Sequence, residues 1–216
     1  MATNRLLDVL HDSALGRPAA TDDPLLILPS PPGPAMAILG LPGRHIVASS
    51  APVNWVRAHL SDDDLMAPMS PRFIAQLSNR IGRSDDGVDL TLAAQALDGT
   101  PDLTEIDPIE HPRVRRALAH RGDVRAFTDA DQDTTVILGR GLAGRLEVAV
   151  EVSPHARNRG VGRCVLRQAR QLLNDGDVLF AQTAAANAAS LRALIAAGYV
   201  PIGAEVLFFH GSRATN

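Results

Sequence analysis

The order of sequence patterns after Pro112 constrains the fold more than any other feature. Short apolar runs are separated there by turns rich in glycine or aspartate, and a helical pattern follows a glycine-rich turn. The patterns predict, in order, a short basic helix, three strands, a helix, a strand, a helix and a last strand, at residues 112–120, 124–128, 134–138, 145–152, 160–173, 178–183, 187–197 and 204–209. An antiparallel meander followed by strand–helix–strand units predicts an α+β fold of layered α/β character, with a mixed, mostly antiparallel central sheet flanked by helices.

The first 108 residues are less regular, and we divide them from the rest at the turn-rich, acidic segment 100–112. Residues 1–34 are expected to be an N-terminal segment that ends in a proline-rich linker. Residues 35–108 are expected to form an α/β portion, either on the acceptor side of a site or as a degenerate copy of the domain at 109–216. Its predicted elements are a hairpin, two helices and a strand, at residues 35–41 with 45–49, 53–60, 71–81 and 89–97.

Composition excludes several kinds of chemistry. The sequence contains no lysine, so Schiff-base enzymes, pyridoxal phosphate enzymes and P-loop nucleotide hydrolases, which need a particular lysine amine, are excluded. The single cysteine, Cys164, cannot form a disulfide within the chain. The formal net charge of −3 gives no general attraction to nucleic acid.

The N-terminal residues and the lengths of the apolar runs indicate where in the cell the protein is located. No apolar run approaches the roughly 20 residues that span a bilayer. Acidic residues such as Asp8, Asp12 and Asp22 interrupt the start of the chain, where a secretory signal would be apolar. We therefore expect a cytoplasmic protein without membrane contact, whose partners are small molecules or proteins.

A glycine-rich turn joins the predicted strand 145–152 to the helix after it. Gly160 and Gly162 lie at the helix start, where unpaired N–H groups and the helix dipole attract anions such as a pyrophosphate. Arginines nearby would add positive charge. A purely structural turn is the alternative. A dinucleotide fold is disfavoured, because no third glycine follows in register and antiparallel strands precede the turn.

Two motifs within residues 109–216 resemble motifs of the GNAT superfamily of acyl-CoA-dependent N-acetyltransferases. The first is Arg157-Asn-Arg-Gly160-Val-Gly162, which matches the family's Arg/Gln-x-x-Gly-x-Gly/Ala signature between its fourth strand and third helix. The second is Asn187-Ala-Ala-Ser190, followed by Gly198-Tyr199, which is similar to a later segment in which an asparagine opens a helix that ends at a glycine and an aromatic residue. The order and separation of the two motifs also match.

The resemblance implies a GNAT-like fold that binds acetyl-CoA or another acyl-CoA in a V-shaped opening between two strands. Backbone amides of the glycine-rich turn would hold the pyrophosphate, the exposed edge of the first strand would pair with the pantetheine arm, and Asn187 would contact that arm or act only as a helix N-cap. The implied contacts are Val150, Val152, Arg157, Asn158, Arg159, Gly160, Val161, Gly162, Arg163, Asn187 and Ser190. No metal is implied.

Two glutamates are candidates for removing a proton from the acceptor amine. Glu147 and Glu151 alternate with valines on one strand, so both are predicted to point to the same face of the sheet. A solvated strand face is the alternative reading of both. Many members of the family carry a tyrosine acid where this sequence has Leu194, and Tyr199 is expected to pack against the sheet.

The resulting hypothesis is direct transfer of an acyl group, acetyl in the first instance, from CoA to an amine on a small molecule, peptide or protein. The alternative is an inactive CoA-binding or interaction module on the same scaffold, which the leucine at position 194 favours. Exposed edge strands make a homodimer plausible. The sequence leaves the acceptor amine open.

Overall fold

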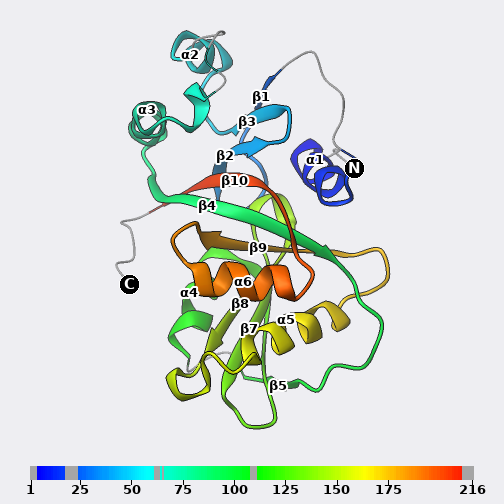
Figure 1. The fold of residues 1–216 in the computed structure, drawn as a ribbon. Helices are drawn as coiled ribbons and strands as arrows, with labels where there is room; N and C mark the ends of the chain where they lie inside the picture. Colours follow the sequence, from blue (N-terminus) through cyan, green and yellow to red (C-terminus); the bar gives the residue numbers. More distant parts are fainter. Residues whose placement is uncertain (1–3, 18–23, 61–63, 65, 108–110, 211–216) are drawn as a thin grey trace.

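A computed structural model describes residues 4–17, 24–60, 64, 66–107 and 111–210 of the 216-residue chain. Within them, the strands form a ten-stranded sheet in the order β1-β3-β2-β10-β4-β9-β8-β7-β6-β5 (Figure 1). Neighbouring strands are antiparallel except for β1 with β3 and β8 with β9. The expected fold class, a mixed and mostly antiparallel sheet flanked by helices, is confirmed.

The elements predicted after residue 112 all form. They are α4 (Pro112–His120), β6 (Gly122–Thr128), β7 (Thr134–Arg140), β8 (Leu146–Val152), α5 (Val161–Gln171), β9 (Val178–Ala184), α6 (Ala188–Ala196) and β10 (Val200–Phe209). The β6–β7 turn shows one local reason: the Asp129 carboxylate accepts from the backbone N–H groups of Asp133 and Thr134 at 2.8 and 3.0 Å, which closes the turn. This boundary therefore follows from short-range hydrogen bonds that a sequence pattern can indicate.

The region between residues 35 and 108 holds the predicted hairpin, helices and strand. They are β2 (Met36–Leu41), β3 (Arg44–Ala48), α2 (Val53–Ala58), α3 (Pro71–Ile81) and β4 (Ser84–Gln95), followed by the short strand β5 (Thr104–Ile106). Ser70 caps α3 by accepting from Phe73 N–H at 3.2 Å, and Gly82 ends it with a φ of 65°. Short 3-10 helices lie at Ala67–Met69, Leu142–Gly144 and Pro154–Ala156.

Two elements lie in the segment 1–34, for which we predict a proline-rich linker at the end and name no helix or strand from the sequence. Helix α1 (Arg5–Ala14) buries Leu6 and Leu10 in a core cluster with Leu142 and Ala143, and β1 (Leu25–Leu28) extends the sheet parallel to β3. The spacing of four residues between the two leucines was the available signal. The opening segment therefore contributes to the core.

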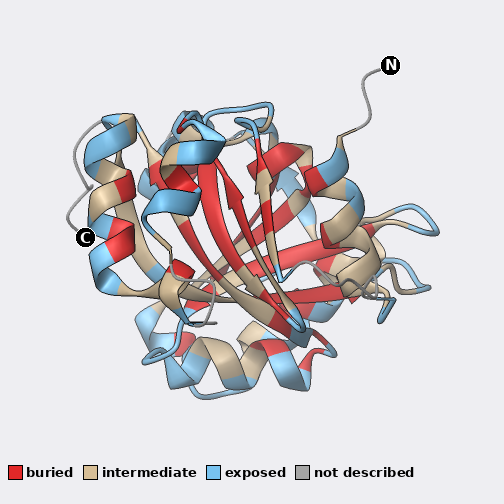
Figure 2. Ribbon diagram, turned by 90° about the horizontal axis from the view of Figure 1, so that it is seen from above, coloured by how far each residue is buried: buried red, intermediate tan, exposed pale blue. Residues whose placement is uncertain are grey.

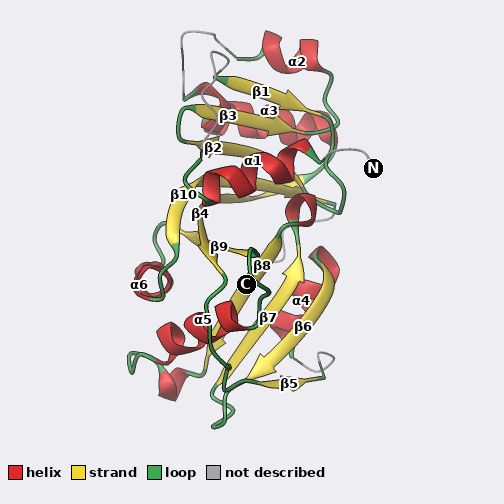
Figure 3. Ribbon diagram, turned by 90° about the vertical axis from the view of Figure 1, so that its right-hand side faces the viewer, coloured by secondary structure: helices red, strands yellow, loops and turns green. Residues whose placement is uncertain are grey.

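The helices cover two faces of the sheet (Figures 2 and 3). Helices α1 and α4 pack on one face, which we call the α4 face: Leu10 clusters with Phe180, and Val114 with Ala149. Helices α2, α3, α5 and α6 pack on the other, the α5 face, where α5 residues meet Val148. Within the described residues, no helix is both long and apolar enough to cross a membrane.

Strands from the two ends of the chain interleave in the middle of the sheet. β4 lies between β9 and β10, and β10 in turn lies between β4 and β2. Figure 1 shows the long β4 and the C-terminal β10 side by side across the molecule. The division at residues 34/35 and 108/109 stays a prediction, but the sheet is continuous across it.

Candidate functional site

The parallel strands β8 and β9 part soon after they meet. Their ladder contains only the pairs Leu146↔Leu179 and Glu147↔Phe180, although β8 continues to Val152 and β9 to Ala184. Past that point β8 pairs with β7 and β9 pairs with β4, each on its outer side. The inner edges beyond Glu147, which we call the strand opening, therefore present backbone groups to which an extended ligand can add as a strand does.

The glycine-rich turn lies at the end of β8. Asn158 and Gly160 have φ values of 61° and 83°, and Gly160 is the N-cap of α5 without a side-chain capping bond. The first bond of the helix runs from Cys164 N–H to Gly160 O, so the amides of the first turn are left to an outside acceptor. The helix dipole favours an anion at this end.

Gly162 brings the helix close to the strand opening. A Cβ atom built on Gly162 would lie 3.6 Å from Val152 Cγ2 and 3.9 Å from Ala193 Cβ. The position therefore faces the end of β8 and α6, and a large side chain there would occupy the space between them.

The arginines of the turn take different positions. Arg157 Nε donates to Val152 O at 3.0 Å, which ties the turn to the end of β8. Arg159 and Arg163 are exposed at the start of α5. These two side chains are placed to add positive charge beside the free amides.

The second motif forms the start of α6. The Asn187 side chain accepts from Ser190 N–H at 3.1 Å, so it acts as an N-cap, and a contact with a ligand would fall to its amide nitrogen. Leu194 is buried beside Tyr199, as the predicted packing role of that tyrosine requires, and Tyr199 OH donates to Leu166 O at 3.3 Å. Burial raises the pKa of Tyr199.

Glu147 and Glu151 both point to the α4 face, as predicted, but their surroundings differ. Glu147 is 3% exposed and accepts from Arg145 Nε at 2.8 Å, Arg121 Nε at 2.9 Å and Leu142 N–H at 3.3 Å. Burial alone would raise the pKa of Glu147, but the two guanidinium groups outweigh it and hold the pKa below its usual value. Glu151 is more exposed and pairs with Arg113 at 2.5 Å.

A buried ionic network continues from Glu147 across the sheet. The Arg145 side chain is fully buried, and its two terminal nitrogens donate to Glu205 at 2.7 and 2.6 Å. Thr91 also donates to Glu205, at 2.8 Å, and the Arg145 guanidinium lies 5.4 Å from the centre of the Phe180 ring. Strands β8, β4 and β10 are thereby connected over β9. No sequence pattern indicates this network, because its members come from distant strands.

Asp89 is a second carboxylate that the sequence patterns do not single out. It lies on β4, opposite Ala184 of β9 on one side and Glu205 of β10 on the other, and it is partly buried. Burial is the main cause that raises the pKa of Asp89 to about 6, and the charges of Glu205 and Asp86 add to it, while Arg116 opposes it. Register places Asp89 on the same face as Glu205, hence on the α4 face.

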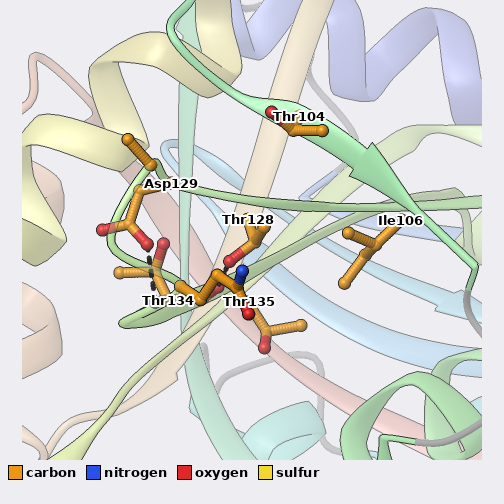
Figure 4. Close-up of a pocket in the computed structure, with 8 residues that line it drawn as sticks. Thr104, Ile106, Thr128, Asp129, Thr134 and Thr135 are labelled. Atoms are coloured by element: carbon orange, nitrogen blue, oxygen red, sulfur yellow. Dashed lines mark hydrogen bonds between the residues drawn. The ribbon is translucent and has the colours of Figure 1, made fainter.

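A cavity of about 380 Å³ lies at the end of the meander, between β5 and the β6–β7 turn (Figure 4). It is lined by Thr104, Ile106, Thr128, Asp129, Ala130, Gln132, Thr134 and Thr135. Figure 4 shows Thr128 and Asp129 engaged in the bonds that close the turn. The cavity borders the end of β8, because Thr134 and Thr135 pair with Val152 and Glu151.

The described residues contain no group of three or more His, Cys, Asp or Glu side chains that could hold a metal ion. Cys164, the single cysteine, is exposed on α5, where Gln168 donates to its sulfur at 3.4 Å.

Comparison with known proteins gives matches only among solved structures; no protein-family model and no curated protein matches the sequence. Similar structures include GCN5-related N-acetyltransferases from Kribbella flavida and Sphaerobacter thermophilus and a GNAT-family acetyltransferase from Colwellia psychrerythraea. Identities are 16, 16 and 12%, and TM-scores are 0.39, 0.40 and 0.36. The matches cover 65, 64 and 64% of this chain and 65, 56 and 62% of those chains, so this chain spans less than two thirds of their length.

Proposed function

We propose that this chain is an acyl-CoA-dependent N-acyltransferase that uses acetyl-CoA and transfers the acyl group directly to an amine. The observation that carries the proposal is the strand opening after Glu147, next to the uncapped start of α5. An open strand edge and a set of free helix amides match the two ends of a CoA molecule, which carries amide groups along its pantetheine arm and a pyrophosphate beyond it. The first GNAT-like motif supplies the start of α5, and the second forms the start of α6.

CoA would be held mainly by backbone groups. The amides of residues 160–163 would bind the pyrophosphate, with Arg159 and Arg163 adding charge. The inner edge of β8 at Val150 and Val152 would pair with the pantetheine arm, and Asn187 and Ser190 would line its path. The acyl end would then reach through the strand opening toward the α4 face.

Acyl transfer needs a proton acceptor for the amine. Its nitrogen attacks the thioester carbonyl carbon, the carbon–sulfur bond breaks, and the amine's extra proton goes to a base. Glu147 is a weak base because two arginines hold it ionised. Asp89, with its pKa raised to about 6, is better matched to neutral pH. We therefore assign Asp89 as the base that accepts the amine's proton, with Glu151 as the second candidate. The leaving thiolate takes a proton from solvent, since Leu194 and the buried Tyr199 supply none.

Calorimetric titration with acetyl-CoA and with CoA tests the binding half of the proposal. Arg163→Glu places a negative charge at the proposed pyrophosphate site, and we expect it to weaken binding of both ligands at least about tenfold. Arg167→Glu is the matched control, because Arg167 is exposed one turn further along α5 and the same charge change there leaves the site open. Equal affinities for the two variants would contradict the proposal.

The alternative, a CoA-binding module without catalysis, is favoured by the ion-paired state of Glu147 and by the buried Leu194. Thiol release from acetyl-CoA in the presence of spermidine, free amino acids and a peptide with a free N-terminus separates the two. Release above the rate without amine supports the transferase. Tight binding without release for any amine supports the module.

A further inference from the structure

Arg121 crosses the strand opening on the α4 face. It is the C-cap residue of α4, and its side chain, 14% exposed, packs beside Gly139 of β7. Its Nε donates to Glu147 of β8 at 2.9 Å and its Nη2 to Gln182 of β9 at 3.4 Å. Glu147 is the last β8 residue that pairs with β9, and Gln182 lies two residues past its partner Phe180. The guanidinium group therefore spans the two strands where they begin to part.

Two buried donors at this point have no acceptor among the described residues. They are Nη1 of Arg121 and Nε2 of Gln182, on the two side chains that meet across the opening. The buried Arg145 differs, because its Nε, Nη1 and Nη2 all donate to carboxylates. Buried donors are nearly always satisfied in folded proteins, so a pair of unused ones points to an oxygen atom that comes from outside the chain.

We propose that Arg121 and Gln182 bind the carbonyl oxygen of the acyl thioester, a role that rests on the proposed acyl transfer. In the proposed binding mode, acyl-CoA has its pyrophosphate at the start of α5 and its pantetheine arm between β8 and β9. The acyl group at the other end of the arm then lies beside these two side chains. Glu147 is a positioning residue in this arrangement: it fixes Arg121 by an ion pair and is itself held by Arg145 and Leu142.

The positive charge of Arg121 is suited to the negative charge that develops on the carbonyl oxygen during acyl transfer. When the amine nitrogen bonds to the carbonyl carbon, the electron pair of the C=O bond moves to oxygen, and a fixed guanidinium stabilises that negative charge. Collapse restores the C=O bond and expels the thiolate, while Asp89 takes the amine's proton. Because Arg121 is ion-paired to Glu147, it keeps its position before the charge develops.

The test compares two ligands that differ only in the carbonyl group. Acetyl-CoA carries the oxygen, whereas S-ethyl-CoA, a thioether of nearly the same size, does not. Calorimetry on the wild-type protein should give about tenfold tighter binding of acetyl-CoA. Gln182→Glu keeps the oxygen that faces Arg121 and replaces the free donor by an acceptor, so it should bring the affinity ratio close to one and leave S-ethyl-CoA binding within about twofold.

Two further variants make the test decisive. Arg121→Met should also remove the preference for acetyl-CoA, and a melting curve checks that the protein still folds without this partner of Glu147. Gln95→Glu is the control: Gln95 is exposed on β4, at the end far from the wide part of the opening, and the ratio should not change.

Each outcome has one meaning. A wild-type protein that binds neither ligand rejects the proposed function and this inference with it. Equal wild-type affinities for the two ligands, a preference that persists in Gln182→Glu, or an equal loss of both ligands in that variant each overturns the carbonyl site and leaves the proposed CoA site standing.

Discussion

At the scale of single residues, the carboxylates of the candidate site differ in how closely arginines compensate their charge. Glu147 and Glu205 share the positive charges of Arg121 and Arg145, so this network of two acids and two bases is neutral. Asp89 lies next to Glu205, and the opposing charge of Arg116 lowers its pKa less than burial and the charges of Glu205 and Asp86 raise it. A partly buried acid beside other acids is costly to ionise, which is why its pKa rises.

Asp89 therefore makes folding stability depend on pH in a defined direction. Its pKa is about 6 in the folded protein and close to the ordinary value near 4 in the unfolded chain. Between these values the folded state binds more protons, so stability falls as pH rises from about 4 to 6 and stays lower above 6. We expect Asp89→Asn to raise the free energy of unfolding by about 1 kcal/mol at pH 7.5, a figure reduced for partial exposure, and not at pH 4.

Urea denaturation at the two pH values measures the effect. Asp98→Asn, at an exposed site in the loop after β4, is the control and should change stability little at either pH. A loss of stability at pH 7.5 in Asp89→Asn would mean that the ionised carboxylate has a partner that stabilises it.

At the scale of elements, short-range signals decided what could be predicted from the sequence. The start and end of α3 follow from Ser70 and Gly82, and the glycine-rich turn and the capped α6 follow from motifs read in order. Asp89, Arg121 and Gln182 could not be found in this way. Their relation depends on strand order and register, which bring together residues 61 positions apart in the case of Arg121 and Gln182.

Helix α1 illustrates the same limit, since its role depends on residues far along the chain. Leu10 is fully buried in the cluster that includes Leu142 and Phe180, and Asn4 Nδ2 donates to Ala143 O at 2.6 Å. Leu10→Ala should lower the free energy of unfolding by about 3 kcal/mol, the usual cost of a cavity in a packed core.

Thermal and urea denaturation check this value against Val53→Ala, which removes apolar atoms from a side chain that is 53% exposed and should cost less than about 0.5 kcal/mol. Similar small losses in both variants would show that α1 does not pack on the core in solution.

At the scale of the whole molecule, the interleaved strands make the two halves depend on each other. Seven residue pairs join β4 to β9, and β10 has β2 and β4 as its two neighbours. A chain of residues 109–216 would lack β4 and leave the edges of β9 and β10 without a partner. We expect this fragment to be unfolded or aggregated alone and to form a soluble complex when produced together with residues 1–108.

Circular dichroism and gel filtration of the separate and combined fragments test the expectation. Cooperative unfolding of residues 109–216 alone would contradict it and would support an autonomous domain with the predicted boundary.

The position of β10 also has a consequence for synthesis of the chain. Among the strands that the structure describes, β10 is the last to leave the ribosome, yet it fills the gap between β2 and β4, which are made more than 100 residues earlier. While translation continues, both of those strands present an open edge toward the place that β10 will take. The nascent protein therefore presents these two edges to other chains from the synthesis of β4 until the ten residues of β10 emerge and pair with both strands.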